Sequence, residues 1–156
     1  EVSKENYSKY LLSKVYDGHI PVYWLLASYF ATEKKELETH TWYYIAIILT
    51  QQEVALCNDK TAIRASNELN KQFNNIMPLV RSSPQHTLKA MNEVMFFIDN
   101  LKEKPNPNWI CYYGYNANEL LNNLTISKNL WKTKRDSIYK DYKKNITNQI
   151  NKTKIN

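Results

Sequence analysis

The chain has 156 residues, of which 43% are hydrophobic and only two are glycine, and its net charge is +6. This hydrophobic content excludes a disordered chain, and the length suits a single core, so we predict one helical domain over residues 1–156. The low glycine content excludes most β-rich folds, which use glycine in hairpin turns and bulges. The composition therefore predicts an all-α fold, a compact bundle of six or seven mostly antiparallel helices.

Apolar residues that recur every three or four positions predict three helices at the start of the chain. The first covers residues 3–16 and ends before Gly18, which we expect as a left-handed cap. The second begins at Pro21, because proline is favoured in the first turn of a helix. A charged turn over residues 32–37 separates it from a third helix at residues 38–57.

Turn signals also divide the middle of the chain. Residues 58–59 are expected to break the chain after the third helix and to provide a capping side chain. A heptad pattern of apolar residues then predicts a fourth helix over residues 62–76, which Pro78 ends. Ser83 followed by Pro84 is a start signal for a fifth helix, with the serine as its N-cap.

The last third of the chain is less regular. The fifth helix is expected to run to Leu101, and the prolines of residues 104–108 predict a rigid connector, because each keeps the preceding residue out of the helical region. Residues 109–115 are aromatic and have no helical period, so both a short helix and an extended strip are open. A helix is expected at residues 116–124, and a long basic helix from residue 126 to about residue 150.

One stretch resembles a known helical family. The sequence YWLLASYF at residues 23–30 is followed, after the charged turn, by TWYYIA at residues 41–46. Residues 20–57 thereby resemble the helix pair of tetratricopeptide-like repeats, in which a small residue lets two aromatic-bearing helices pack closely. The pattern does not recur at a fixed period, so an ordinary helical hairpin is the alternative. The resemblance implies a scaffold that binds other proteins.

Positive charge is concentrated at the end of the chain. Residues 127–156 contain nine Lys or Arg and two Asp, a net charge of +7, whereas residues 1–126 carry −1. We expect a basic helix there, frayed at its end, with a patch that comprises Lys128, Lys132, Lys134, Arg135, Lys140, Lys143 and Lys144.

Three roles are open for this helix: a solvated face, a contact with nucleic-acid phosphates, or a docking site for an acidic protein or anionic lipid. In the first case the lysines face water and apolar residues face the core. Those apolar residues are Ile126, Leu130, Ile138, Tyr142 and Ile146.

The two cysteines, Cys57 and Cys111, form no CxxC pair, which excludes a thioredoxin-type or zinc-ribbon motif. They could form one disulfide or lie buried as two small hydrophobic residues. The chain begins at Glu1, so we expect a periplasmic or secreted location if a signal peptide was removed, and otherwise a cytoplasmic one. No stretch approaches the roughly 20 apolar residues that cross a bilayer, so no transmembrane segment is expected.

Motifs for catalysis and cofactor binding are absent from the sequence. Phosphate-binding loops need closely spaced glycines, and Gly18 and Gly114 lie far apart. The GxSxG and HExxH motifs are also missing, and no base adjoins Cys57 in sequence to activate it as a nucleophile. We therefore predict no catalytic residue and no cofactor.

Histidines and acidic residues gather at the start of the third helix, where Glu36, Glu38 and His40 are close in sequence. Acidic residues favour the positive N-terminus of a helix, and a metal site usually needs three or more converging ligands. We predict no metal site there, and we assign no role to His19 or His86.

A partner-binding surface is predicted from two polar or aromatic clusters. Tyrosine and tryptophan are favoured in interfaces, and the non-periodic segment supplies Trp109, Tyr112, Tyr113 and Tyr115. The densest polar cluster on the third helix adds Gln51, Gln52 and Glu53. The alternatives are an aromatic lid folded back over the bundle and a simple solvated face on the helix.

These features predict a non-enzymatic protein-binding domain, because such domains use aromatic side chains as binding hot spots. Its partner would be another protein, and a bacterial toxin-neutralising (immunity-type) protein, bound to a toxin or effector, is the specific hypothesis from size and composition. One alternative is a nucleic-acid-binding protein that uses the basic C-terminal helix. Another is an enzyme of unrecognised type, with a site assembled only by the fold.

Overall fold

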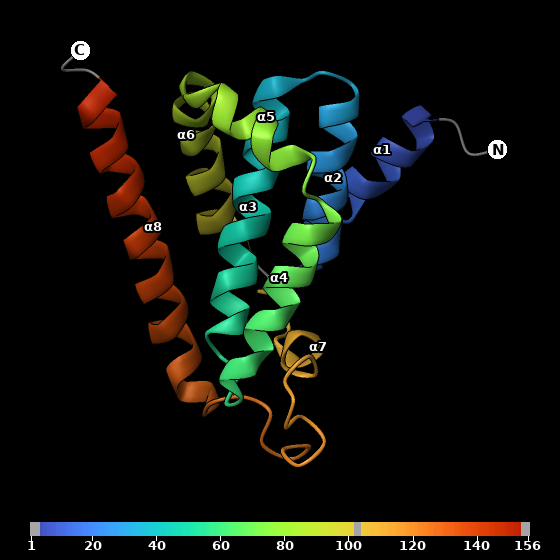
Figure 1. The fold of residues 1–156 in the computed structure, drawn as a ribbon, viewed down its shortest axis with the longest axis vertical. Helices are drawn as coiled ribbons and strands as arrows, with labels where there is room; N and C mark the ends of the chain where they lie inside the picture. The colour runs from blue at the N-terminus through green and yellow to red at the C-terminus, as the bar shows by residue number, and fades with distance from the viewer. Residues whose placement is uncertain (1–3, 102–103, 154–156) are drawn as a thin grey trace. The chain divides into compact units, whose positions relative to one another are not determined.

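A computed structural model describes residues 4–101 and 104–153 of the chain (Figure 1). The regular elements of these residues are eight α-helices and three short 3-10 segments, and the only β pairing among them is an isolated bridge between Cys57 and Thr125. The all-α prediction is confirmed, with eight α-helices in the described residues rather than six or seven.

The chain divides into two compact units. Unit 1 comprises Glu1–Ile47 and Leu69–Pro105, and unit 2 comprises Ile48–Glu68 and Asn106–Asn156. Two helices, α3 (Glu36–Val54) and α4 (Ile63–Gln72), contribute residues to both units. The remaining α-helices of unit 1 are α1 (Lys4–Ser13), α2 (Ile20–Thr32), α5 (Ile76–Ser82) and α6 (Pro84–Asn100).

Local signals placed the first helices of unit 1 correctly. Gly18 has a φ of 71° and follows a 3-10 turn, η1 (Val15–Asp17), so the predicted left-handed cap is confirmed. Pro21 lies in the first turn of α2, where its missing N–H needs no intrahelical acceptor.

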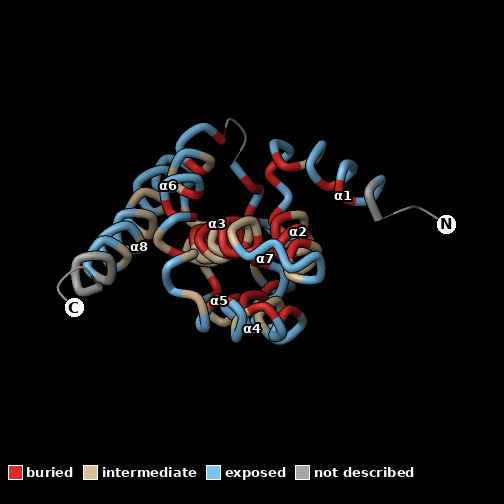
Figure 2. The backbone as a smooth tube through the Cα atoms, turned by 90° about the horizontal axis from the view of Figure 1, so that it is seen from above, coloured by how far each residue is buried: buried red, intermediate tan, exposed pale blue. Residues whose placement is uncertain are grey.

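Aromatic side chains fill the core of unit 1. Tyr23 and Trp24 are buried, and the phenol of Tyr23 donates a hydrogen bond of 2.8 Å to the carbonyl oxygen of Val15. Burial raises the pKa of Tyr23 well above its usual range. The ring of Tyr23 stacks on Trp42 at 6.2 Å between centroids, and Trp24 stacks on Phe73 at 5.4 Å. Figure 2 shows the concentration of buried positions along α2 and α3.

Two helix boundaries of unit 1 differ from the prediction. The predicted fourth helix ends earlier than expected, at Gln72 of α4, and Pro78 lies inside the first turn of a separate helix, α5, instead of ending a helix. A proline is tolerated there because the first N–H groups of a helix have no intrahelical acceptor. Ser83 precedes α6 as predicted, but its hydroxyl donates to Oε2 of Glu36 at 3.3 Å rather than capping the helix.

Unit 2 contains α7 (Asn108–Cys111), α8 (Trp131–Thr153) and two 3-10 segments, η2 (Lys60–Ala62) and η3 (Lys128–Leu130). The side chain of Asp59 caps η2, as expected of residues 58–59. The prediction of a helix at residues 116–124 is wrong, because these residues form successive turns.

Helix α8 begins at Trp131 rather than at Ile126. The amide of Ile126 donates to the carbonyl oxygen of Leu56 at 2.8 Å, and Thr125 bridges Cys57, so these residues pair with another segment instead of starting the helix. The predicted fraying at the end of the chain concerns residues 154–156, which lie outside the described part.

The turn after α2 holds Lys34 in a left-handed conformation, with a φ of 57°. The amide of Lys35 donates to the carbonyl oxygen of Phe30 at 2.9 Å, and the amide of Lys34 donates to that of Ala31 at 3.1 Å. This pair of bonds is the Schellman motif, whose left-handed position usually holds glycine because a Cβ there is strained. Lys34 therefore occupies a position at which its side chain costs stability.

We expect Lys34→Gly to raise the free energy of unfolding by about 1 kcal/mol, because glycine removes the Cβ strain. The neighbouring Lys35→Gly is the matched control: its φ is not positive, so added backbone freedom in the unfolded chain should lower stability. Urea denaturation of the three proteins measures both effects. If the Lys34→Gly variant is no more stable than the Lys35→Gly variant, the inferred backbone strain at Lys34 is contradicted.

Candidate functional site

The disulfide between Cys57 and Cys111 joins the end of α3 to α7 in unit 2. Its Cα atoms are 5.2 Å apart, and both cysteines are buried. The bridge closes a loop across 54 residues, which by chain entropy stabilises the folded state by about 4 kcal/mol. It also fixes the backbone immediately before Tyr112 and Tyr113.

The carboxylate of Asp59 holds the backbone just after these tyrosines. It accepts hydrogen bonds from the amide of Thr61 at 2.9 Å, from its hydroxyl at 2.7 Å and from the amide of Asn116 at 2.8 Å. The hydroxyl oxygen of Thr61 in turn accepts from the amide of Tyr115 at 2.8 Å. The bonds from the Thr61 hydroxyl, the Asn116 amide and the Thr61 amide lower the pKa of Asp59.

Gly114 allows this close approach. A Cβ built on Gly114 would lie 2.5 Å from Oδ2 and 2.8 Å from Cγ of Asp59. Any side chain at position 114 would therefore push the carboxylate away from its donors. Glycine is required here by the packing of one segment against another.

Arg64, on the first turn of α4, supports two of the tyrosines. Its guanidinium lies over the ring of Tyr115, 4.0 Å from the centroid, and Nη1 donates to the carbonyl oxygen of Tyr113 at 3.4 Å. The half-buried Trp109 meets Tyr113 edge to face, at 6.4 Å between centroids.

The three tyrosines are nevertheless exposed: Tyr112 by 53%, Tyr113 by 45% and Tyr115 by 71%. Their rings therefore do not fold inward, as the alternative of an aromatic lid would require. We call Tyr112, Tyr113 and Tyr115, with Arg64 and Trp109, the tyrosine face.

The polar cluster predicted on α3 is largely buried. Glu53 is fully buried and Gln52 is 3% exposed. The Glu53 carboxylate accepts two hydrogen bonds from Arg135, from Nε at 2.8 Å and from Nη2 at 2.7 Å. Gln52 donates to the carbonyl oxygen of Arg135 at 3.0 Å, and the half-buried Gln51 donates to Ser66 at 3.0 Å. Glu53 can be buried because Arg135 on α8 supplies the positive charge that pairs with its carboxylate.

Arg135 is accordingly not part of an exposed basic patch. Its side chain is 11% exposed, and its guanidinium also lies over the ring of Trp131 at 5.4 Å. Lys132 is exposed and pairs with Asp136 at 2.7 Å. The exposed lysines of the predicted patch are Lys128, Lys132, Lys134, Lys140, Lys143 and Lys144.

The apolar residues of α8 are less buried than predicted. Leu130, just before the helix, is 51% exposed, and Ile138, Tyr142 and Ile146 are only half-buried. None of the side chains at residues 131–148 is fully buried, as the colours of α8 in Figure 2 show.

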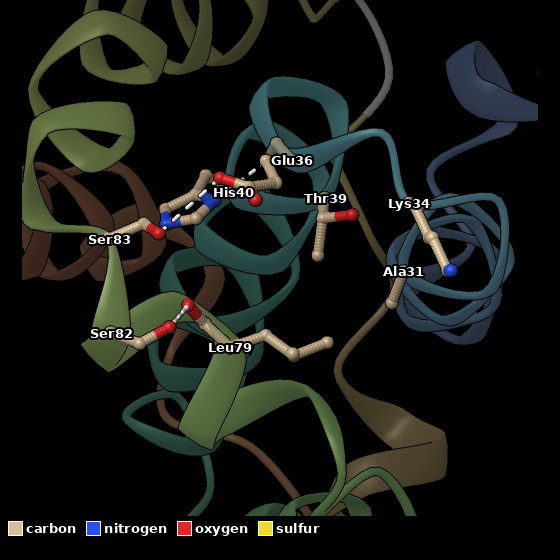
Figure 3. A pocket seen from close by; sticks show the side chains of 8 residues that line it. All are labelled: Ala31, Lys34, Glu36, Thr39, His40, Leu79, Ser82 and Ser83. Carbon is tan, nitrogen blue, oxygen red and sulfur yellow. Dashed lines mark hydrogen bonds between the residues drawn. The ribbon is translucent and has the colours of Figure 1, made fainter.

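Unit 1 contains a cavity of about 290 Å³ whose lining includes both polar and apolar side chains (Figure 3). It is lined by Ala31, Lys34, Glu36, Thr39, His40, Leu79, Ser82 and Ser83. The view places Glu36, His40 and Ser83 on one side and Lys34 on the opposite side.

His86, to which no role was assigned from the sequence, lies beside this cavity. Its Nδ1 atom is 2.8 Å from Oε2 of Glu36, and its ring is 5.7 Å from that of His40. Both nitrogens of His40 already face backbone carbonyl oxygens, of Glu36 at 2.7 Å and of Val80 at 3.3 Å. No group of three His, Cys, Asp or Glu side chains in the described residues is arranged to hold a metal ion.

Unit 1 also carries an open apolar hollow of about 500 Å³ between α3 and α6. Its floor includes the half-buried Trp42 and Phe97 and the buried Ile45, and Phe96 at its edge is 71% exposed. The hydroxyl of Thr41, which also lines the hollow, donates to Oε2 of Glu93 at 3.2 Å.

Comparison with protein-family models, with curated proteins and with solved structures gives no match for this chain. Across residues 4–101 and 104–153, none of the helices is both long enough and apolar enough to span a membrane.

We expect Arg135→Met to lower the free energy of unfolding by about 3–5 kcal/mol, because it removes the guanidinium that pairs with the buried Glu53 carboxylate. The double variant Glu53→Leu with Arg135→Met removes both charges and should recover most of this loss. A double-mutant cycle by urea denaturation measures the coupling. If the double variant is as unstable as Arg135→Met, the loss of the ion pair with Glu53 does not explain the lower stability of the single variant.

The lowered pKa of Asp59 predicts a pH dependence with a defined sign. Its stabilising effect is complete above the unfolded-state pKa of about 3.9 and is lost as pH falls through the lower folded-state value. Asp59→Asn should therefore be less stable than the parent chain at neutral pH, and the difference should shrink in acid. Thermal melts from pH 7 to pH 2 measure it, with the exposed Asp99→Asn as the control. If the stability difference between the parent chain and Asp59→Asn does not change with pH, the Asp59 carboxylate does not stabilise the fold through its charge.

Proposed function

We propose that this chain is a non-enzymatic protein-binding domain and that the tyrosine face is its binding surface. The observation that carries the proposal is the combination of exposed rings and a fixed backbone. Large aromatic side chains supply contact area with little rotamer entropy to lose, and they dominate binding hot spots. A surface that is already ordered before binding loses less entropy when the partner arrives.

Several contacts that fix this backbone come from one stretch of unit 2, residues 57–64. Cys57 bonds covalently to Cys111, Thr61 accepts from the amide of Tyr115, and Asp59 accepts from the amide of Asn116. Arg64 donates to the carbonyl oxygen of Tyr113. If these tyrosines served only to stabilise the fold, their rings would be expected to point inward. Their exposure, at 45–71%, supports a role in recognition.

Within this class, a toxin-neutralising (immunity-type) protein is the more specific proposal. It is supported by the small size of the chain and by its wealth of tyrosine, 12 residues of the 156. Such a protein would have to cover a toxin surface with rigid contacts made in advance, as the tyrosine face could provide. The exposed lysines of η3 and α8 favour a second candidate function, nucleic-acid binding.

A photo-crosslinking amino acid placed at single positions tests the proposed surface. Placed at Tyr112 in the full chain, within the producing cells, it should trap one discrete protein on illumination. Tyr10 on α1 is 60% exposed and is the matched control position, from which no such product is expected. Equal products from both positions, or none from Tyr112, would contradict the proposal. Products from Phe96 alone would move the binding surface to the hollow of unit 1.

A further inference from the structure

Charge is distributed unequally between the two units. Unit 2 contains eleven Lys or Arg and six Asp or Glu, a net charge of +5, whereas unit 1 contains ten and nine, a net charge of +1. Two of the six acids of unit 2 are buried, since Glu53 is paired with Arg135 and Asp59 holds backbone amides. The surface that unit 2 presents is therefore distinctly positive.

The tyrosine face presents several hydrogen-bond donors that the fold leaves unused. The three phenol hydroxyls make no hydrogen bond within the described residues. Arg64 uses Nη1 for the carbonyl oxygen of Tyr113, and its remaining N–H groups have no acceptor in the same part of the chain. A set of O–H groups and a guanidinium fits a partner rich in acceptors, above all carboxylates.

We infer that the tyrosine face binds an acidic protein surface and that the lysines of η3 and α8 accelerate its approach. The inference rests on the proposed binding function of the tyrosine face. Charges outside a contact change mainly the rate of association, whereas buried aromatic contacts change mainly the rate of dissociation. The two sets of residues therefore have separable kinetic effects.

The same surface is less suited to nucleic acid. Single strands stack their bases on open aromatic faces, but one face of the Tyr115 ring is covered by Arg64. Asp136 and Asp141 lie among the lysines of α8, and Lys132 is already paired with Asp136. Carboxylates so placed repel a continuous run of phosphates but can match basic groups on a protein surface of mixed charge.

Selection from a random-peptide display library on the intact, folded chain tests the inference without knowledge of the natural partner. The variant Tyr112→Ser with Tyr113→Ser serves for counter-selection, since both rings are exposed and their loss should leave the fold intact, which circular dichroism checks. Peptides that bind the parent chain and not this variant should be enriched in Asp and Glu. Their association rate should fall about tenfold or more between low and high salt.

Lysine variants then separate the two roles. Replacing Lys140, Lys143 and Lys144 by Glu should lower the association rate about tenfold and leave the dissociation rate within about twofold. The matched control replaces Lys9, Lys71 and Lys89, three exposed lysines of unit 1, by Glu and should have a smaller effect.

Peptides that bind the parent chain but not the double tyrosine variant are called tyrosine-dependent. If these peptides are not enriched in acidic residues, or if their association rate does not change in the α8 lysine variant, the inference is overturned and the proposed function still stands. If no tyrosine-dependent peptide is recovered, the proposed function itself fails. A single-stranded oligothymidylate serves as the competing probe. Tyrosine-dependent binding of this oligonucleotide, tighter than that of the peptides, would overturn the inference in favour of nucleic acid.

Discussion

The carboxylate of Asp59 is the acceptor on which the order of unit 2 depends. It joins its own turn to a segment 57 residues away, and Gly114 leaves room for the contact. The side-chain amide of the adjacent Asn58 donates to the carbonyl oxygens of Asn123 and Thr125, at 2.8 Å each. One short stretch after α3 therefore fixes both the tyrosine face and the residues that lead into α8. An acidic side chain is suited to this position because a charged acceptor makes stronger hydrogen bonds than a neutral one.

Features set by a few neighbouring residues could be predicted from the sequence. The left-handed cap at Gly18, the helix starts at Pro21 and Pro84 and the capping role of Asp59 depend on backbone preferences that each residue carries with it. The aromatic segment was also recognised as unusual, because it follows a proline-rich connector and lacks a helical period. Its exposure could not be decided, since that depends on Arg64 and Asp59, which are distant in sequence.

Errors arose where distant residues decide the outcome. Glu53 and Arg135 were assigned to two different surfaces, although they form one buried pair across 82 residues. The residues that neighbour each charge in sequence do not reveal its distant partner, so both side chains were predicted to be exposed to solvent. The pairing of Thr125 and Ile126 with the end of α3 similarly replaced the expected helix start. The tetratricopeptide-like resemblance stays a prediction, as do the enzyme and nucleic-acid alternatives.

The shallow burial of α8 has a consequence for the motions of the chain. Arg135, one turn from its start, is 11% exposed, and residues 136–148 contribute only half-buried or exposed side chains. Local opening requires free energy in proportion to the buried contacts that are broken. The later turns of α8 therefore form a low-energy foldon, whose amides exchange with solvent long before those in the aromatic core of α2. Such a helix can open and close many times while the remainder of the chain stays native.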